Sequence, residues 1–217
     1  MTDTYIIRTP ISGVVLIERP VFTDDRGFFH EIERRTELES AVRFDLRHAQ
    51  WNHSRSRKSV LRGIHVAQWN KCVYTVRGTA QIAVCDLRPE SRTFGQHVSY
   101  AIGERRRVAV FIPAGCGNSF LALTGLVDYM YSVDSVWYPD GEYGIAWNDP
   151  DLAIDWKIKR PLLSERDQSN PTLRERFPAW FDATRVRGSN GMPALVRSVG
   201  DSRPGDGRAI LVGSSKR

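Results

Sequence analysis

Residues 71–87 read KCVYTVRGTAQIAVCDL, two apolar runs rich in β-branched residues on either side of Gly78-Thr79. Val, Ile, Thr and aromatic residues favour strands, and a glycine-containing pair between two such runs is typical of a tight turn. The pattern therefore predicts strands over Cys72–Arg77 and Ala80–Leu87, paired as a β-hairpin.

Similar runs occur along most of the chain. They predict further strands over Gly13–Ile17, Val108–Ile112 and Leu126–Val136. Helix signals are weak, with one short helix expected over Arg35–Val42, where Thr36 is a candidate cap, and another over Pro171–Phe177. Many short strands between turn signals predict an all-β domain, a sandwich or barrel of jelly-roll type with short peripheral helices.

Length and composition indicate one globular domain followed by a tail. The chain has 217 residues, 41% of them hydrophobic, and all-β domains of this length often form a single unit. Residues 1–186 form the expected domain, and residues 187–217, rich in Gly, Ser, Arg and Pro, are expected to be disordered. Within the tail, Arg208–Ser215 has the pattern of the first strand and glycine turn of a dinucleotide-binding unit, but no helix pattern follows it.

Charge and cysteine content bound the partners and the compartment. Of the net charge of +6, the tail supplies +4, from six Lys or Arg against two acids, which leaves +2 for residues 1–186. This excludes an extended nucleic-acid surface, yet it suffices for one cleft that attracts phosphate. The three cysteines, Cys72, Cys85 and Cys116, are an odd number inside expected strands, which argues against a disulfide framework.

No targeting or membrane segment is evident. Met1–Thr4 lacks the basic start and apolar run of a signal peptide. No apolar stretch approaches the roughly 18 residues that span a bilayer. We therefore expect a cytoplasmic protein with no membrane partner.

Val60-Leu61-Arg62-Gly63-Ile64-His65, followed by Lys71, places two cations and a possible base along what the pattern predicts to be one hairpin. A lone histidine in a strand is more often a packed polar residue than a catalyst. Because alternate residues of a strand share a face, Arg62 and His65 enter one pocket only if a bulge or similar distortion separates them.

Three other side chains have both a structural and a catalytic interpretation. Asp167, beside Arg166, is either a surface ion pair or a buried carboxylate that orients a histidine. Tyr131, two residues from Tyr129 on one strand face, is either core or a proton donor in a cleft. Arg26 is either part of an Asp-Asp-Arg-Gly turn or a phosphate clamp, and in the second case Phe29 and Glu31 lie on one strand face to meet a base.

The chain lacks the metal ligands common in jelly rolls of the cupin type. Those use a His-x-His pair with a later Glu, and a second His shortly after Pro-x-Gly. Here the first motif offers only His65, and the second, which begins at Pro113, ends in Asn118, with Cys116 a poor lone substitute. We expect no catalytic metal.

Eight short motifs, taken in order, resemble those of one family. They are Asp25-x-Gly27-x-Phe29-x-Glu31, Gln50-Trp51-Asn52-His53-Ser54, Leu61-Arg62-Gly63-Ile64-His65, Val76-Arg77-Gly78, Phe94-Gly95, Ile112-Pro113-x-Gly115, Gly144-Ile145-x-Trp147-Asn148-Asp149-Pro150 and Leu163-Ser164-x-x-Asp167. From about residue 12 to 172 the chain resembles the dTDP-4-dehydrorhamnose 3,5-epimerases.

This resemblance implies a metal-free cupin, a double-stranded β-helix, that works as a homodimer without a cofactor. The implied reaction epimerises a 4-keto-6-deoxy hexose attached to dTDP. By position, His65 resembles the family's base, Asp167 its orienting partner, Tyr131 the phenol that reprotonates the opposite face, and Lys71 the cation beside the enolate. The implied substrate or nucleotide contacts, some from the partner subunit, are Arg26, Phe29, Glu31, Gln50, Asn52, Arg62 and Trp137.

Three departures from the family pattern alter the walls of the implied site. Asn118, an expected substrate contact, stands where the family usually has His; the segment between His65 and Lys71 is shorter by several residues and carries Trp69; and Trp137 replaces a more usual tyrosine. We therefore expect a shifted substrate, either another nucleotide-linked 4-keto sugar or inversion at only one of C3 and C5.

Two other functions stay open. A cupin 3,4-ketoisomerase shares the proton transfer but typically relies on further histidines, so Asn118 disfavours it. A non-catalytic sugar-nucleotide-binding subunit is disfavoured because His65, Tyr131 and Asp167 are all present.

Overall fold

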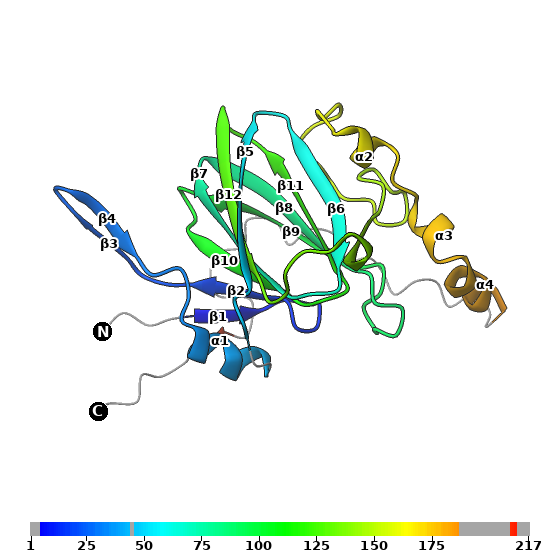
Figure 1. The fold of residues 1–217 in the computed structure, drawn as a ribbon, viewed down its shortest axis with the longest axis horizontal. Coiled ribbons are helices and arrows are strands. Elements are labelled where there is room, and N and C mark those ends of the chain that lie inside the picture. Colours follow the sequence, from blue (N-terminus) through cyan, green and yellow to red (C-terminus); the bar gives the residue numbers. More distant parts are fainter. Residues whose placement is uncertain (1–4, 44–45, 187–208, 212–217) are drawn as a thin grey trace.

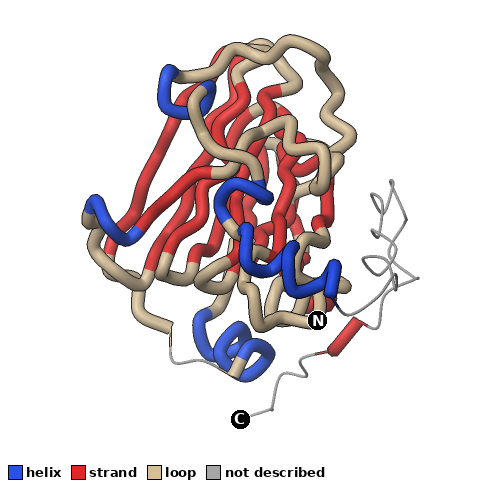
Figure 2. The backbone as a smooth tube through the Cα atoms, turned by 90° about the vertical axis from the view of Figure 1, so that its right-hand side faces the viewer, coloured by secondary structure: helices blue, strands red, loops and turns tan. Residues whose placement is uncertain are grey.

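The computed structural model describes residues 5–43, 46–186 and 209–211, and its body consists of two facing antiparallel β-sheets (Figure 1). The helices lie at the periphery (Figure 2). The larger sheet has the order β14 (Ala209–Leu211), β1 (Tyr5–Arg8), β2 (Val15–Glu18), β10 (Val108–Ile112), β7 (Lys71–Arg77), β12 (Leu126–Val133) and β5 (Gln50–Arg57).

The smaller sheet faces it and supplies the other half of the sandwich. Its order is β13 (Glu142–Gly144), β6 (Leu61–Ala67), β11 (Cys116–Ala122), β8 (Thr79–Asp86) and β9 (His97–Gly103). A separate hairpin of β3 (Val21–Asp24) and β4 (Gly27–His30) projects away from both sheets (Figure 1).

The apolar core lies between the two sheets. Val73 and Val110 of the larger sheet and Ile82 and Val84 of the smaller sheet are each fully buried within one cluster. Burial of this apolar surface is the main force that holds the two sheets together. The prediction of an all-β jelly roll is confirmed.

Short helices cover the outer faces of the sheets. On the larger sheet, α1 (Arg35–Val42) packs Leu38 and Ala41 into a second apolar cluster. On the smaller sheet, the C-terminal part of the domain packs Leu173 and Phe181 into a third cluster. Leu173 belongs to α3 (Leu173–Arg176) and Phe181 to α4 (Pro178–Val186), whereas η1 (Pro139–Gly141) and α2 (Glu165–Gln168) lie next to β6. Because both faces of the central strands are covered, strands such as β10 are buried along their whole length.

The strands predicted around Gly78-Thr79 exist, but the hairpin between them is wrong. β7 pairs with β10 and β12 in the larger sheet, whereas β8 pairs with β9 and β11 in the smaller one. The connection crosses between sheets at Gly78, where φ is +74° and any Cβ would collide with the Leu126 carbonyl. The hairpin expected for β6 and β7 is wrong for the same reason, since these strands also lie in opposite sheets.

The helix predictions are partly right. α1 has the predicted bounds, but Thr36 is not its cap; Arg34 occupies that position without a capping side-chain hydrogen bond. The helix expected over Pro171–Phe177 is the single turn α3, closed by a capping box between Thr172 and Glu175. It ends before Pro178, because the residue preceding a proline disfavours helical backbone. The sequence analysis missed α4.

Most of the 187–217 tail lies outside the described residues, so the expected disorder there stays a prediction. Its part Ala209–Leu211 forms β14, which pairs antiparallel with β1. A dinucleotide-binding unit starts from a strand of a parallel sheet, so this pairing argues against such a unit. Within the described ranges the three cysteines are buried free thiols, and no helix there is long and apolar enough to cross a membrane.

Truncation of the core between the sheets should destabilise the domain. Ile82→Ala is expected to lower the free energy of unfolding by about 2–5 kcal/mol, because Ile82 is fully buried and leaves a cavity. Leu162→Ala, at a side chain that is 56% exposed, should cost less than about 1 kcal/mol. Urea denaturation measures both, and equal losses would contradict this account of the core.

Candidate active site

A bulge in β6 turns Arg62 and His65 toward the interior between the sheets. Opposite them in β11, Phe120 pairs with Arg62 and Asn118 with His65, so three steps along β6 match two along β11. Leu61, Ile64 and Val66 pack in clusters on the outer face, which leaves Arg62 and His65 on the inner one. The distortion that the sequence analysis required is therefore present.

His65 and Asp167 form a hydrogen-bonded pair. The distance from His65 Nε2 to Asp167 Oδ1 is 2.7 Å, and the Asp167 side chain is only 4% exposed. Asp167 also receives weaker hydrogen bonds from the Gly63 amide and the Asn170 side chain. Of the two interpretations of Asp167, the buried carboxylate is therefore correct and the surface ion pair is wrong.

The chemistry of the pair follows from burial and donors. Burial by itself raises the pKa of Asp167, but the hydrogen bond and charge of His65, with the Ser164 and Gly63 donors, outweigh it and lower the pKa. Asp167 thus stays an anion that fixes Nε2 of the imidazole. Nδ1 is the nitrogen that remains to accept a proton.

Lys71 and Tyr131 lie together on the inner face of the larger sheet. Lys71 is 5% exposed and its Nζ lies 5.9 Å from the centre of the Tyr131 ring. Burial lowers the pKa of Lys71, partly offset by Glu142, whose Oε2 is 3.6 Å from Nζ. Burial, and then the charge of Glu142, raise the pKa of Tyr131, while Arg62 lowers it. The side chains of Lys71 and Tyr131 thus lie side by side, and burial disfavours the charged form of each.

Asn118 and Tyr129 connect the two sheets. Tyr129 is fully buried, stacks on Phe120 and donates from its hydroxyl to Asn118 Oδ1 at 3.1 Å. Because Asn118 is directly opposite His65 in the β11–β6 ladder, their side chains are on the same face. Tyr129 shares its face with Tyr131, at 6.4 Å between ring centres, so this hydrogen bond connects the surroundings of His65 and Tyr131.

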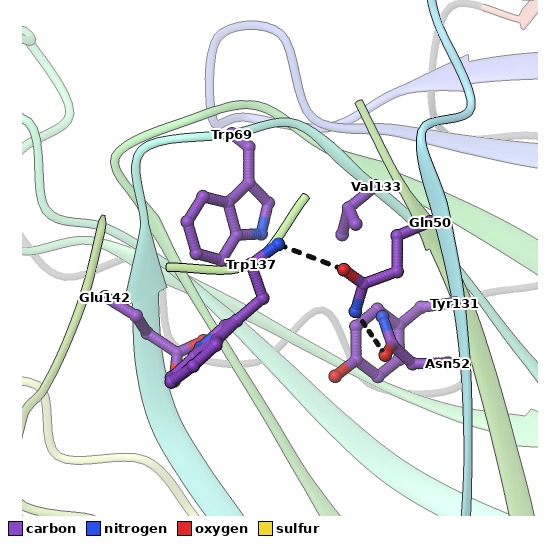
Figure 3. Close-up of a pocket in the computed structure, with 7 residues that line it drawn as sticks. All are labelled: Gln50, Asn52, Trp69, Tyr131, Val133, Trp137 and Glu142. Carbon is purple, nitrogen blue, oxygen red and sulfur yellow. Dashed lines mark hydrogen bonds between the residues drawn. The ribbon is translucent and has the colours of Figure 1, made fainter. Parts of the chain in front are cut away.

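A pocket of about 400 Å³ opens beside Tyr131 (Figure 3). Gln50 donates to Asn52 Oδ1 at 2.7 Å and accepts from the Trp137 backbone amide at 3.0 Å, which fixes this wall. The residues that line the pocket are Gln50, Asn52, Trp69, Tyr131, Val133, Trp137 and Glu142. The pocket therefore combines the expected contacts Gln50, Asn52 and Trp137 with the candidate phenol.

The expected contacts on the projecting hairpin are not in this pocket. Arg26 is 90% exposed and, among the described residues, pairs with Asp24 of its own hairpin at 2.5 Å. Phe29 is 65% exposed, and Glu31 binds Arg19 and Arg34 at the base of the hairpin. Arg62, on β6, is also exposed and is not among the residues that line this pocket; its side chain donates to the Ser56 hydroxyl at 3.0 Å.

Three residues of the pocket wall, Trp69, Val133 and Glu142, were not among the predicted site residues. Glu142 follows a Pro-Asp-Gly turn, and one acid after a turn has no recognisable pattern. Trp69 stood out only as part of the short segment after His65; it is 4% exposed and packs edge-to-face on Tyr138 at 5.4 Å.

Nothing in the described ranges resembles a metal centre. No group of three or more His, Cys, Asp or Glu side chains gathers there as ligands of an ion. Asn118 is engaged by Tyr129, and Cys116 is buried with its pKa raised to about 12 by burial. The expectation of a metal-free site stays a prediction.

The fold and these side chains define a jelly-roll enzyme with groups suited to proton transfer. The family model of dTDP-4-dehydrorhamnose 3,5-epimerase matches residues 8–175. The dTDP-4-dehydrorhamnose 3,5-epimerase of Pseudomonas aeruginosa is 40% identical over 173 residues, which cover 77% of this chain and 95% of that protein. The chain belongs to the dTDP-4-dehydrorhamnose 3,5-epimerase family, and the predicted family and enzyme class, an isomerase, are confirmed.

Solved structures agree with this assignment. A 4-keto-6-deoxy sugar epimerase from the novobiocin biosynthetic gene cluster of Streptomyces spheroides matches with a TM-score of 0.79 and 34% identity, over 81% of this chain and 90% of that one. A 3'-monoepimerase from Streptomyces bikiniensis, solved in complex with dTDP-quinovose, matches with a TM-score of 0.74 and 33% identity, over 83% and 98%.

Loss of the Asp167 charge should change how stability depends on pH. The folded-state pKa of Asp167 is below its ordinary value of 3.8, so its stabilising contribution is complete above about pH 5 and disappears as the pH falls through the lowered pKa. Asp167→Asn should therefore lower the free energy of unfolding by on the order of 2 kcal/mol at pH 7, and by progressively less in acid.

Urea denaturation between pH 7 and pH 3 measures this difference. Asp155→Asn is the matched control, because Asp155 is a 70% exposed carboxylate paired with Lys157. A cost for Asp167→Asn that is the same at every pH would show that the charge of Asp167 contributes nothing.

Proposed function

We propose that this protein epimerises a dTDP-linked 4-keto-6-deoxy sugar by removing a proton beside the ketone and returning one from the opposite face. The observation that carries the proposal is the distribution of groups over the two sheets. The His65–Asp167 pair is on the inner face of the smaller sheet, and Tyr131 with Lys71 is on the inner face of the larger sheet. A base and an acid on opposite walls are what inversion needs.

His65 acts as the base in this proposal. A C–H bond beside a ketone is weakly acidic, and a positioned general base contributes about 10²–10⁴-fold to the rate. Asp167 holds Nε2 and stabilises the imidazolium that forms, so Nδ1 takes the proton. The proton leaves carbon, and its bonding electrons move onto the ketone oxygen as an enolate.

Lys71 stabilises the enolate oxygen, and Tyr131 delivers the new proton. A preorganised charge in a water-poor site increases the rate about 10²–10³-fold when it faces the charge that develops in the transition state. Tyr131 must be protonated to donate, and its raised pKa supports that role. The resulting phenolate lies beside the Lys71 ammonium, which stabilises it until solvent restores the proton.

The pocket beside Tyr131 takes the nucleotide part of the substrate. A volume of about 400 Å³ with mixed aromatic and amide walls suits a nucleoside. Gln50 and Asn52 contact the nucleotide through their amides, and Trp137 packs on the nucleobase. Arg62 meets the diphosphate or sugar from the side of His65, and Asn118 contacts the sugar.

The protein works as a homodimer whose hairpins complete the neighbouring sites. The β3–β4 hairpin projects from its own subunit (Figure 1) and exposes Phe22, Phe28 and Phe29 by 51%, 53% and 65%. Such an apolar projection is typical of a surface covered by another chain. Arg26, Phe29 and Glu31 then contact the substrate of the partner subunit. The buried free thiols suit a reducing compartment, and we place the reaction in the cytoplasm.

Solvent deuterium incorporation tests the proposed reaction. Incubated with dTDP-4-keto-6-deoxyglucose in deuterated water, the protein should place deuterium at C3, C5 or both, with inversion, as read by NMR of the product. His65→Asn should abolish exchange. Tyr131→Phe should lower the rate of inversion by at least about 10²-fold, because the acid on the opposite face is gone. Deuterium exchange from the His65 face should persist.

Tyr143→Phe is the matched control, since Tyr143 packs on the outer side of the smaller sheet. Binding of dTDP should persist in all three variants. Binding without exchange in the wild type would identify a sugar-nucleotide-binding subunit instead, and migration of the carbonyl to C3 would identify a ketoisomerase.

Mixing two inactive variants tests the exchange of hairpins between subunits. Arg26→Ala removes the hairpin contact and His65→Asn removes the base, so each homodimer should be nearly inactive. In a mixed dimer, one site has both an intact base and an intact hairpin, and activity should recover to about a quarter of the wild type. No recovery after subunit exchange would place Arg26 in its own subunit's site or outside any site.

A further inference from the structure

Glu142 lies between two cations at the edge of the pocket. Its Oε2 is 3.6 Å from Lys71 Nζ, and its Oε1 is 2.9 Å from Arg166 Nη1. The Glu142 side chain is 14% exposed, whereas that of Arg166 is 49% exposed. The carboxylate thus connects a buried ammonium to a guanidinium at the surface.

The backbone places Glu142 beside the proton-transfer groups. In β13, Gly144 is opposite His65 and Glu142 is opposite Ala67, so Glu142 is on the face of the sheet to which His65 points. Figure 3 shows Glu142 on the pocket wall across from Tyr131. Arg166 precedes Asp167 in α2, the short helix that supplies the carboxylate of the dyad.

The geometry leaves Lys71 free to bind a substrate oxygen. At 3.6 Å, the Lys71–Glu142 contact is longer than a normal hydrogen bond, while Arg166 takes the other carboxylate oxygen at hydrogen-bond distance. Glu142 therefore acts on Lys71 mainly through its charge and leaves ammonium N–H groups for a substrate oxygen. An ammonium buried this deeply loses its proton readily unless an anion is close.

We propose that Glu142 is a positioning residue of the proposed epimerase, which holds the Lys71 ammonium beside Tyr131 and keeps both side chains protonated at the working pH. This rests on the proposed function, because enolate stabilisation and reprotonation both require those protons. Through Arg166, Glu142 also ties Lys71 to the helix that carries Asp167. The negative charge of Glu142 raises the pKa of Lys71 and of Tyr131, consistent with this role.

Several other charged groups lie near Lys71. Arg166 of α2 lowers the pKa of Lys71, opposite in sign to Glu142. On the other side of the sheet, Lys71 borders a small cavity where Asp134 is bound by Asn70 and His48 by Glu33. Arg47 lines the same cavity and adds positive charge. Among the described groups, Glu142 is the carboxylate that forms an ion pair with Lys71 Nζ.

Glu142→Gln keeps the shape of the side chain and removes its charge. The alkaline limb of the kcat profile should move to lower pH by about one to two pH units, because both Lys71 and Tyr131 then lose their protons more easily. At pH 6 the variant should retain kcat within about threefold, and KM should change little. Glu142→Asp should restore part of the alkaline activity.

Two further variants sharpen the test. Arg166→Gln removes a positive charge, so its alkaline limb should stay in place or move to higher pH, the opposite of Glu142→Gln. Asp155→Asn, which breaks an exposed ion pair with Lys157, should leave the profile unchanged. A loss of kcat in Glu142→Gln that is equal at all pH values, or an alkaline limb that does not move, would overturn the proposal.

Titration of Lys71 by NMR of ¹³Cε-labelled lysine, assigned with Lys71→Arg, separates this inference from the proposed function. In the free protein, the Lys71 midpoint should fall in Glu142→Gln and not in Asp155→Asn. If no keto sugar exchanges but the midpoint falls, the coupling holds and the proposed reaction fails. If sugars exchange normally and the midpoint does not fall, the role of Glu142 is overturned.

Discussion

The hydrogen bond between His65 and Asp167 joins residues 102 positions apart and is the constraint on which the site depends. A buried carboxylate is costly unless donors satisfy it. Asp167 obtains them from His65, from the Gly63 amide and from the Asn170 side chain, while its own backbone amide donates to the Ser164 hydroxyl that caps α2. The C-terminal segment that covers the smaller sheet therefore also orients the imidazole. A change in how α2 packs would alter the chemistry as well as stability.

The two-sheet architecture separates opposite chemical tasks. The imidazole–carboxylate pair comes from β6 and α2 on one side, and the ammonium and phenol come from β7 and β12 on the other. The core between the sheets holds the walls at a fixed separation, so a ring bound between them would meet one group on each face. Glu142 is on β13, which pairs with β6, the strand of His65. Its carboxylate therefore acts from the smaller sheet on the charge of Lys71 in the larger sheet.

Local sequence predicted the strands well and their partners poorly. The runs around Gly78 were recognisable because β-branched residues favour strands wherever they pair, but crossing between sheets is decided by contacts far along the chain. The same limit separates the two parts of the site. His65 and Asp167 lie in recognisable motifs, and Tyr131 could be proposed from its predicted strand and the family resemblance. Glu142 is one acid after a turn and gains meaning only from the neighbours that the fold brings to it.

The departures from the family pattern gather around the proton-transfer groups without removing any of them. Asn118, opposite His65, binds the Tyr129 hydroxyl through a neutral amide, so no second imidazole titrates at that position. Trp69 is fixed in the wall by the Asn70–Asp134 hydrogen bonds that follow it, and it fills space beside Val133 and Tyr131. A large rigid ring and an uncharged neighbour change the shape and polarity available to the sugar, while base, acid and ammonium stay in place. Under the proposed function, these changes act on which sugar the site accepts and leave the proposed proton transfer unaltered.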